Sequence, residues 1–349
     1  MFVVRPVKKE DLSALYEISA LTNAGLTTLP HDREVLEQRI EDSTHSFAKK
    51  SRKPKGEIYF FVLENTENDK VVGTCAVLSK VGGFEPFYTY KIKTAVKHSK
   101  ALNVRNKIQY LQLMKNHSGP SEVATLFLLP SIRQKGVGRL LSLSRFLFIA
   151  QYPACFESSI IAEMRGVLDS KGRSPFWNSV GKHFFEVEFE KADLMVMRDK
   201  SFIADLIPDH PIYIPLLSLS AQAVIGKVHE ETEPALHLLK AEGFKPNGEI
   251  DIFEAGPVVE AKRDKIHSVK ESQEAVVSKI EKGKISADDL IIANASDFSN
   301  FRATLGTLTI NADKTVSLTD DIAKVLDIKE GEKVRFVQLR KMRKPNDEE

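Results

Sequence analysis

The chain has 349 residues, which is long enough to bury a large apolar core without disulfides or structural metals. Its 50 Lys and Arg residues are balanced by 48 Asp and Glu residues, which excludes an overall field that attracts nucleic acids or membranes. The sequence shows neither a secretory leader nor an apolar run of about eighteen residues. Cys75 and Cys155 both lie among apolar residues, so we expect reduced core thiols in a cytoplasmic protein.

The first third of the chain is predicted to alternate short strands with amphipathic helices. Apolar residues spaced three and four apart predict helices at 12–22 and 32–43. Two apolar runs on either side of the polar segment 65–69 predict a β-hairpin. The strands expected in this region are 2–6, 57–63, 70–78, 87–92 and 109–114.

The most informative segment is a buried strand, a turn with two glycines, and an apolar helix. Residues 122–129 form the predicted strand, 133–139 the turn and 140–150 the helix. A helix start offers unpaired N–H groups and the positive end of the helix dipole, and glycine lets the backbone approach an anion closely. This order is therefore typical of a pyrophosphate-binding loop. The glycines and cations of the turn are Arg133, Lys135, Gly136, Gly138 and Arg139.

The rest of the chain falls into several parts. A strand at 158–164 follows the apolar helix and is predicted to lie nearly parallel to the strand before it. An amphipathic helix at 231–242 ends at Gly243 and leads into a strand at 248–253. Residues 262–287 are charged and helix- or linker-like. Other expected elements are helices near 176–185 and 200–206, and short strands at 290–293, 302–311, 315–318 and 333–339.

Several motifs carry a resemblance to known proteins. Arg-x-x-Gly-x-Gly at 133–138, between a strand and a helix, resembles the coenzyme A loop of the GCN5-related N-acyltransferases. Over nearly its whole length the chain resembles the arginine N-succinyltransferase family. Residues 116–119 depart from that family, because they read Asn-His-Ser-Gly where it tends to carry Asp-x-Thr-Gly. The matching stretches are 22–30 (TNAGLTTLP), 125–128 (TLFL), 144–146 (SRF), 162–166 (AEMRG), 174–177 (SPFW), 210–213 (HPIY), 224–229 (VIGKVH), 243–244 (GF) and 251–253 (DIF).

The resemblance implies both a fold and an activity. The fold would be α+β, a GCN5-related acyltransferase domain at 1–260 with a mixed central sheet flanked by helices and a helical insertion at 167–228. Residues 261–349 would form a linker and a small C-terminal β subdomain. The activity would be transfer of the succinyl group of succinyl-CoA to the α-amino group of L-arginine, the first step of the succinylating route of arginine degradation. Succinyl-CoA would be a co-substrate, with no permanently bound cofactor and no metal.

Acyl transfer from a thioester makes three chemical demands. The donor's phosphates must be held, the developing oxyanion must be stabilised, and protons must leave the amine and reach the thiolate. By resemblance, the N–H group of Leu126 stabilises the oxyanion and His229 is the proton donor to the thiolate; imidazole exchanges protons near neutral pH. The residues expected to bind coenzyme A are Leu126, Arg133, Gln134, Lys135, Gly136, Val137, Gly138 and Arg139.

A guanidinium acceptor calls for carboxylates, with which it pairs well. Glu163, Asp169 and Asp251 lie nearest in sequence to the expected site. Glu163 stands out because it interrupts the apolar run 160–164, where a charge needs a partner. Further candidates for substrate contacts are Arg165 and the loop 23–28, both for the succinyl carboxylate, and His210 and Tyr213.

Two alternatives stay open at this point. An acyltransferase of the same fold would differ only in its substrates, using ornithine or acetyl-CoA. A different class is suggested by residues 306–336, which resemble the swapped-hairpin DNA-binding modules of bacterial transition-state regulators. That segment lacks a basic excess, so we expect a small β unit that packs on the catalytic domain or at an oligomer interface, with no nucleic-acid partner.

Overall fold

The computed structural model describes residues 1–22, 28–49, 53–83, 85–133, 136–283, 289–295 and 297–339. Within these ranges, no helix is both long and apolar enough to cross a bilayer. The strands are β1 (Phe2–Pro6), β2 (Ile58–Asn65), β3 (Lys70–Leu78), β4 (Phe87–Ser99), β5 (Val104–Asn116), β6 (Ser121–Leu128), β7 (Ser159–Glu163), β8 (Ile212–Tyr213), β9 (Lys245–Ile250), β10 (Pro257–Lys262), β11 (Gln273–Glu281), β12 (Leu290–Asn294), β13 (Ala303–Gly306), β14 (Thr309–Ile310), β15 (Val316–Thr319) and β16 (Lys333–Gln338). The α-helices are α1 (Leu12–Ser19), α2 (Arg33–Lys49), α3 (Val137–Gln151), α4 (Pro175–Ser179), α5 (Gly181–Phe185), α6 (Phe189–Met195), α7 (Ser201–Leu206), α8 (Leu219–Val224), α9 (Glu233–Ala241), α10 (His267–Glu271) and α11 (Asp320–Leu326).

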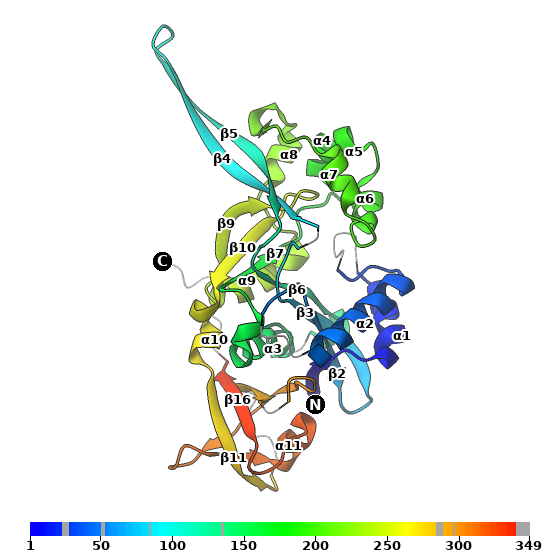
Figure 1. Cartoon of the computed structure of the whole chain (residues 1–349), viewed down its shortest axis with the longest axis vertical. Helices are drawn as coiled ribbons and strands as arrows, with labels where there is room; N and C mark the ends of the chain where they lie inside the picture. Colours follow the sequence, from blue (N-terminus) through cyan, green and yellow to red (C-terminus); the bar gives the residue numbers. More distant parts are fainter. Residues whose placement is uncertain are drawn as a thin grey trace.

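One continuously hydrogen-bonded sheet runs through the molecule (Figure 1). Among the described residues its strands follow the order β14-β15-β11-β16-β12-β13-β1-β2-β3-β6-β7-β10-β9-β4-β5-β8. The pairs of the catalytic part are antiparallel except β6 and β7, which are parallel. This mixed sheet with helices on its faces confirms the predicted α+β, GCN5-related acyltransferase fold class.

Helices cover both faces of the central strands because β2 and β3 are apolar on both sides. Phe60 and Val62 of β2 pack in a cluster with α1 and α2. The alternate residues Tyr59 and Phe61 face the opposite side and pack around α3. Eleven of the fifteen residues of α3 are buried, because the helix lies between this sheet and the C-terminal strands β12, β13 and β16. A helix that is apolar all round needs such cover on every side.

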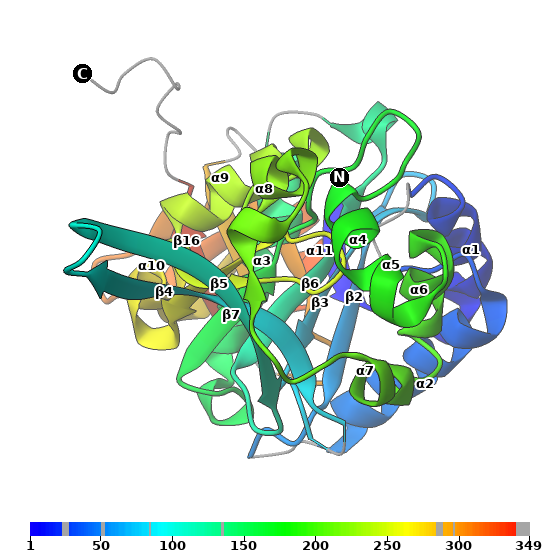
Figure 2. The same ribbon diagram turned by 90° about the horizontal axis from the view of Figure 1, so that it is seen from above.

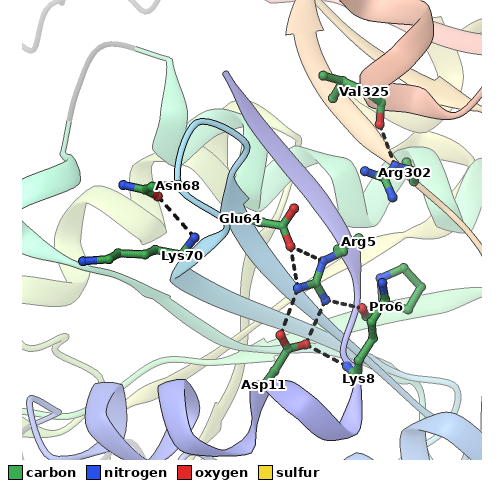
Figure 3. Close-up of polar contacts among 9 residues, drawn as sticks. All are labelled: Arg5, Pro6, Lys8, Asp11, Glu64, Asn68, Lys70, Arg302 and Val325. Atoms are coloured by element: carbon green, nitrogen blue, oxygen red, sulfur yellow. Dashed lines mark hydrogen bonds and ion pairs between the residues drawn. The ribbon is translucent and has the colours of Figure 1, made fainter.

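A buried ion-pair cluster fixes the end of β1 (Figure 3). The Arg5 guanidinium donates to both carboxylate oxygens of Asp11, at 2.8 and 2.9 Å, and its Nε donates to Glu64 at 2.7 Å. The neighbouring Arg302 donates from Nε to the carbonyl oxygen of Val325 at 2.5 Å. Because Arg5 is buried and both carboxylates share it, this cluster fixes local geometry rather than adding much net stability.

The parallel pair β6 and β7 separates toward its carboxyl end. Their register pairs are Ser121 with Ile160 and Glu122 with Ile161. Beyond these pairs β6 stays bonded to β3 and β7 to β10, so the two strands diverge and leave a wedge between them. The nearly parallel arrangement confirms the prediction for 122–129 and 158–164, and the wedge positions the site described below.

Two features extend beyond the central sheet. The hairpin β4–β5 projects as a long ribbon from one end of the molecule, and the insertion helices α4 to α8 lie beside its base (Figures 1 and 2). These helices pack around the single tryptophan, Trp177, which is 1 % exposed. The predicted helices near 176–185 and 200–206 are confirmed, with the first divided into α4 and α5.

The C-terminal residues form a small β unit that continues the main sheet. β13 pairs with β1 in the register Val3 with Thr304, and the Thr304 hydroxyl donates to the Phe2 carbonyl oxygen at 2.7 Å. Phe301 packs its ring against Phe148 of α3 at a centroid distance of 5.1 Å. The segment 306–336 thus belongs to a unit that packs on the catalytic part, as expected.

Four sequence predictions differ from the structure. Residues 87–92 and 109–114 are parts of longer strands, because the ribbon continues past the body with mostly exposed side chains that give no apolar period. The linker-like segment 262–287 contains β11, which lies between β15 and β16 and has mostly exposed side chains. The strand expected at 248–253 runs instead over 245–250, where Gly248 adopts a positive φ. The predicted division at residue 260 falls inside β10, which pairs with β7 up to Lys262.

Candidate active site

The start of α3 is the first part of the site. Gly136 is the N-cap residue, with φ of 95°, a value that residues with a Cβ rarely adopt. The Val137 side chain is buried in the core, which leaves its backbone to the helix start. Arg133 is exposed and Arg139 lies half-buried in the first helical turn. Gln134 and Lys135 fall outside the described residues. The helix start therefore has the form expected of an anion-binding loop.

A β-bulge on β6 is the second part. Thr125 has φ of 54°, and the register with β3 shifts so that Thr125 and Leu126 both lie opposite Cys75. Such bulges re-aim the backbone and occur often beside active sites. The buried Arg145 of α3 supports the strand here, since its Nη1 donates to the Ala124 carbonyl oxygen at 3.4 Å. The bulge puts the backbone of Leu126 at the wedge between β6 and β7.

His229 is held on the other side of the wedge. The backbone N–H of His229 donates to the Arg165 carbonyl oxygen at 2.9 Å, which ties this residue to the chain just beyond β7. Its Nδ1 accepts the N–H of Glu231 at 3.2 Å, so the proton of the neutral ring is assigned to Nε2. Partial burial and the nearby Arg165 cation lower the pKa of His229, against the opposing effect of Glu231 and Glu230. The ring is therefore neutral at pH 7.

Arg165 lies between His229 and a cavity. Its Nη1 is 3.4 Å from the Glu231 carboxylate. Its Nε and Nη2 are buried and have no hydrogen-bond partner among the described residues. A buried guanidinium with two unsatisfied donors is costly, so this one is suited to an anion that arrives with a ligand.

The cavity next to Arg165 has about 690 Å³ of empty space, its open mouth included. It is unusually rich in carboxylates, which come from the end of β7, from α6 and from the turn between β9 and β10. Lys200 faces the same space. The charged lining residues are Glu163, Arg165, Asp193, Lys200, Asp251 and Glu254, and the apolar ones include Phe87, Tyr88, Ile203 and Phe253.

The carboxylates of this cavity are poorly solvated. Burial raises the pKa of Glu163 well above its ordinary value, and the neighbouring Glu122 and Asp251 raise it further. Burial and Asp251 act in the same way on the pKa of Glu254. The pKa of Asp251 is raised less, because its carboxylate accepts backbone N–H groups from its own turn. Carboxylates crowded in this way favour a cationic ligand.

The structure brings some of the predicted substrate residues together and separates others. Glu163, Asp251 and Arg165 line one cavity. Asp169 is instead partly buried, outside the cavity lining, and bonded to Arg173 at 2.7 Å. His210 is exposed, and Tyr213 lies on the edge strand β8 with its ring 6.0 Å from that of Tyr110; neither lines the cavity, and their substrate role stays a prediction. Of the loop 23–28, residues 23–27 fall outside the described residues.

Sequence reasoning missed three charged residues of the cavity. Asp193 and Lys200 belong to the insertion, whose sequence has no clear period. Glu254 follows a predicted strand in a turn, where a carboxylate usually meets solvent, but it is only 5 % exposed. The sequence offers only the nearby Gly256, whose need for glycine the structure explains: a Cβ there would come within 1.8 Å of the Met164 carbonyl oxygen.

Comparisons with known proteins identify the family of the chain. Residues 2–268 match the family model of the arginine N-succinyltransferase beta subunit, and residues 273–338 match the model of that subunit's C-terminal domain. The arginine N-succinyltransferase of Yersinia pseudotuberculosis (serotype O:3, strain YPIII) is 42% identical over 345 residues, which cover 97% of this chain and 98% of the relative. That of Escherichia coli (strain 55989 / EAEC) is 41% identical over 341 residues, with the same coverage of both chains.

A solved structure is similar over the same length. It is the arginine/ornithine succinyltransferase subunit AI from Pseudomonas aeruginosa, with a TM-score of 0.88 and 33% sequence identity, and the match covers 97% of this chain and 98% of that one. The motifs, the fold and these full-length matches agree with one another. The chain therefore belongs to the arginine N-succinyltransferase family.

Proposed function

We propose that this protein transfers the succinyl group of succinyl-CoA to the α-amino group of L-arginine, the entry step of a succinylating route of arginine breakdown. The observation that carries the proposal is the cavity where Glu163, Asp251 and Glu254 gather beside the unsatisfied guanidinium of Arg165. Such a site offers carboxylates to a cationic acceptor and a cation to an anionic acyl group. The buried thiols Cys75 and Cys155 fit a reducing, cytoplasmic location.

The donor is placed along the wedge between β6 and β7. Its pyrophosphate binds the helix start at 133–139, with the N–H groups after Gly136 as donors. Its thioester lies at the bulge, where the N–H of Leu126 faces the carbonyl oxygen and stabilises the negative charge of the tetrahedral adduct. Arg165 pairs with the terminal carboxylate of the succinyl group, which an acetyl group lacks.

The acceptor enters from the cavity, with its guanidinium against Glu163. Its amine attacks the thioester carbon, so a C–N bond forms and the C–S bond breaks. His229 gives a proton from Nε2 to the departing sulfur. The proton that the adduct nitrogen loses then replaces the proton on Nε2, so Nδ1 keeps accepting the Glu231 N–H; the Glu231 carboxylate lies 3.8 Å from Nδ1.

Mass spectrometry of the products tests the proposal. The protein is incubated with L-arginine and succinyl-CoA, and we expect one succinyl group on the α-amino nitrogen with release of one free thiol. Parallel reactions contain ornithine in place of arginine, or acetyl-CoA in place of succinyl-CoA. A higher kcat/KM for ornithine or for acetyl-CoA would replace the stated substrate, and no product with any of these pairs would overturn the proposed function.

A further inference from the structure

Glu254 has an arrangement that the proposed roles leave unexplained. Its Oε2 accepts the N–H of Gly166 at 2.9 Å, deep in the wall of the cavity. Its Oε1 is buried and has no hydrogen-bond partner among the described residues. A carboxylate oxygen that is kept from water and from donors is costly, so its persistence calls for a ligand group that hydrogen bonds to it.

The Glu254 carboxylate and His229 are held by one peptide group. The peptide group between Arg165 and Gly166 makes both contacts. Its carbonyl oxygen accepts the backbone N–H of His229, and its N–H, on Gly166, donates to the Glu254 carboxylate. In a trans peptide these two groups point in opposite directions, so His229 and Glu254 lie on either side of a single peptide plane. The close approach of Gly256 to Met164 keeps the two chain segments in contact. The peptide therefore sets the spacing between two titratable groups.

The other cavity carboxylates are arranged differently. Asp251 accepts N–H groups from Phe253 and Glu254, so its oxygens stabilise the turn. Glu163 is only partly buried at the end of β7, where it lines the cavity, and its proposed partner is the guanidinium of the acceptor. Glu254 differs from both in pairing one fixed oxygen with one unsatisfied oxygen.

We propose that Glu254 is the general base, which takes the proton that the acceptor's α-ammonium group must lose before its nitrogen attacks the thioester. This inference rests on the proposed function. The ammonium nitrogen loses two protons in a turnover. The first passes to Oε1 of Glu254 and then to solvent, and the second leaves the adduct nitrogen through His229 and ends on the sulfur of coenzyme A. The N–C bond forms, the C–S bond breaks and an S–H bond forms, so charge and protons balance.

The electrostatics agree with this role. Burial raises the pKa of Glu254, while Arg165 and the Gly166 N–H act in the opposite direction. A carboxyl group tuned upward in this way is a better base toward an ammonium group than an exposed carboxylate. A base on the acceptor side and an acid on the sulfur side, separated by one peptide, match the two ends of the reaction.

The test compares E254Q with the wild type in full kinetics. Gln is isosteric and its amide oxygen still accepts the Gly166 N–H, but it cannot take a proton. We expect kcat with arginine to fall by about 10²–10⁴-fold, with the affinity for succinyl-CoA in calorimetry unchanged. The loss should shrink as pH rises toward the pKa of the substrate ammonium group, because the free amine then needs no base.

Further variants keep the outcomes distinct. H229Q should lose activity without such alkaline recovery, since its defect lies at the sulfur. If E254Q does not fold, E254D retains a titratable group at shorter reach, and a reduced kcat with the wild-type pH profile is expected. A kcat for E254Q within tenfold of the wild type, a loss that does not depend on pH, or an E254D variant with wild-type kcat would each overturn the inference. A wild-type protein that fails to succinylate arginine would overturn the proposed function instead.

Discussion

At the residue scale, charge in the acceptor cavity is the most consequential feature. Four carboxylates, of Glu163, Asp193, Asp251 and Glu254, line a space shared with only two cations. Burial raises the pKa of Glu163, Asp251 and Glu254, so the ligand-free site is unfavourable when these three groups are charged. In the proposed function, a bound arginine supplies the missing positive charge, so these same groups are expected to give both affinity and specificity for a cationic acceptor.

The first prediction concerns Glu163 and the acceptor. Replacement by Gln keeps the shape and removes the charge that pairs with the guanidinium. Hydrogen bonds to charged groups contribute about 1.5–3 kcal/mol, so KM for arginine should rise by roughly tenfold to a hundredfold. Steady-state kinetics at saturating succinyl-CoA measures this, with KM for succinyl-CoA as the internal control. An unchanged KM for arginine would show that the guanidinium binds elsewhere.

The second prediction concerns His229. Its replacement by Gln removes the proton for the sulfur but retains an acceptor for the Glu231 N–H that caps the following turn. General acid catalysis contributes about 10²–10⁴-fold, so kcat should fall by that factor. Stopped-flow detection of the thiol measures the step directly. With a succinyl thioester whose thiol is more acidic, the sulfur needs less help from a proton donor, so the loss of kcat in H229Q should be smaller. An equal loss of kcat with this thioester and with succinyl-CoA would contradict the assignment.

The third prediction follows from the raised pKa values of Glu163 and Glu254. In the unfolded chain these groups have the ordinary pKa of 4.5, and in the native protein their pKa is higher. At a pH between these two values the native protein therefore binds more protons than the unfolded chain. The free energy of unfolding of the ligand-free protein should therefore fall as pH rises through this window. His229 has the opposite effect on stability below pH 6.5, because its pKa is lower in the native protein than in the unfolded chain. It is one group against several carboxyl groups, so the decline should dominate.

Urea unfolding across this range of pH tests the linkage. Saturating L-arginine should flatten the decline, because its guanidinium stabilises the charged carboxylates in the native state. Calorimetry in two buffers of different ionisation enthalpy should show release of protons when arginine binds. Stability of the ligand-free protein that rises with pH in this window would contradict the electrostatic account of the cavity.

Sequence reasoning identified part of this site for a physical reason. Glu163 was recognisable because a charge within an apolar strand needs a partner, which is a local signal. Glu254 was not, because its burial arises from contact between turns that are 88 positions apart in the sequence. His229 and Leu126 were assigned through resemblance alone, since one imidazole or one backbone N–H carries no pattern of its own.

At the element scale, the helix start and the bulge work as a pair. Gly136 caps α3 with a positive φ, and a Cβ there would come within 3.1 Å of Leu305 in β13. The C-terminal strands therefore support the loop that is proposed to hold the donor. This contact gives the C-terminal unit a role in the site although it contributes no residue to the acceptor cavity.

The fourth prediction tests that support. Gly136→Ala combines backbone strain with pressure on Leu305, so KM for succinyl-CoA should rise by at least tenfold while KM for arginine changes little. Gly172→Ala is the matched control, because Gly172 also has a positive φ of 72° but lies outside the cavity lining, and a Cβ there would meet no neighbouring atom within 4 Å. Gly172→Ala should lower the free energy of unfolding and leave KM for succinyl-CoA unchanged. Equal effects of both variants on KM would show that strain, and not the loop, determines the result.

Predictability differed among the elements. The strand, turn and helix at 122–150 have strong periods and were located within one or a few residues. β10 was not predicted, although Gly256 and Pro257 form a turn signal directly before its apolar run. β11 was missed because most of its side chains are exposed and many are polar or charged, which resembles a charged linker, although the strand pairs with β15 and β16 on its two sides.

At the scale of the whole molecule, α3 joins two parts of the chain into one cooperative structure. Its Phe148 contacts Phe61 of the catalytic sheet and Phe301 before β13, at centroid distances of 5.2 and 5.1 Å. Neither part can bury α3 without the other. We therefore expect both to unfold together, although the family models treat the C-terminal part separately.

The fifth prediction uses Phe301→Ala. Loss of a buried Phe costs about 3–5 kcal/mol, and the whole chain should unfold at a lower urea concentration. Trp177 lies in the insertion helices, so its fluorescence reports a region remote from the substitution (Figure 1). The Trp177 transition should shift together with far-UV circular dichroism. Leu102→Ala at the exposed ribbon tip, where Leu102 is 75% exposed, should shift neither. A Trp177 midpoint that stays in place would show independent units.

The pairing of β1 with β13 has a consequence for synthesis in the cell. During synthesis β1 leaves the ribosome long before β13. One edge of β1 pairs with residues 61–65, but the other edge waits for residues 303 and 304. Until then the nascent chain carries an open strand edge and an uncovered face of α3. An open strand edge of this kind favours association with other nascent chains made from the same messenger RNA. Such a chain is expected to bind chaperones until the last part of translation.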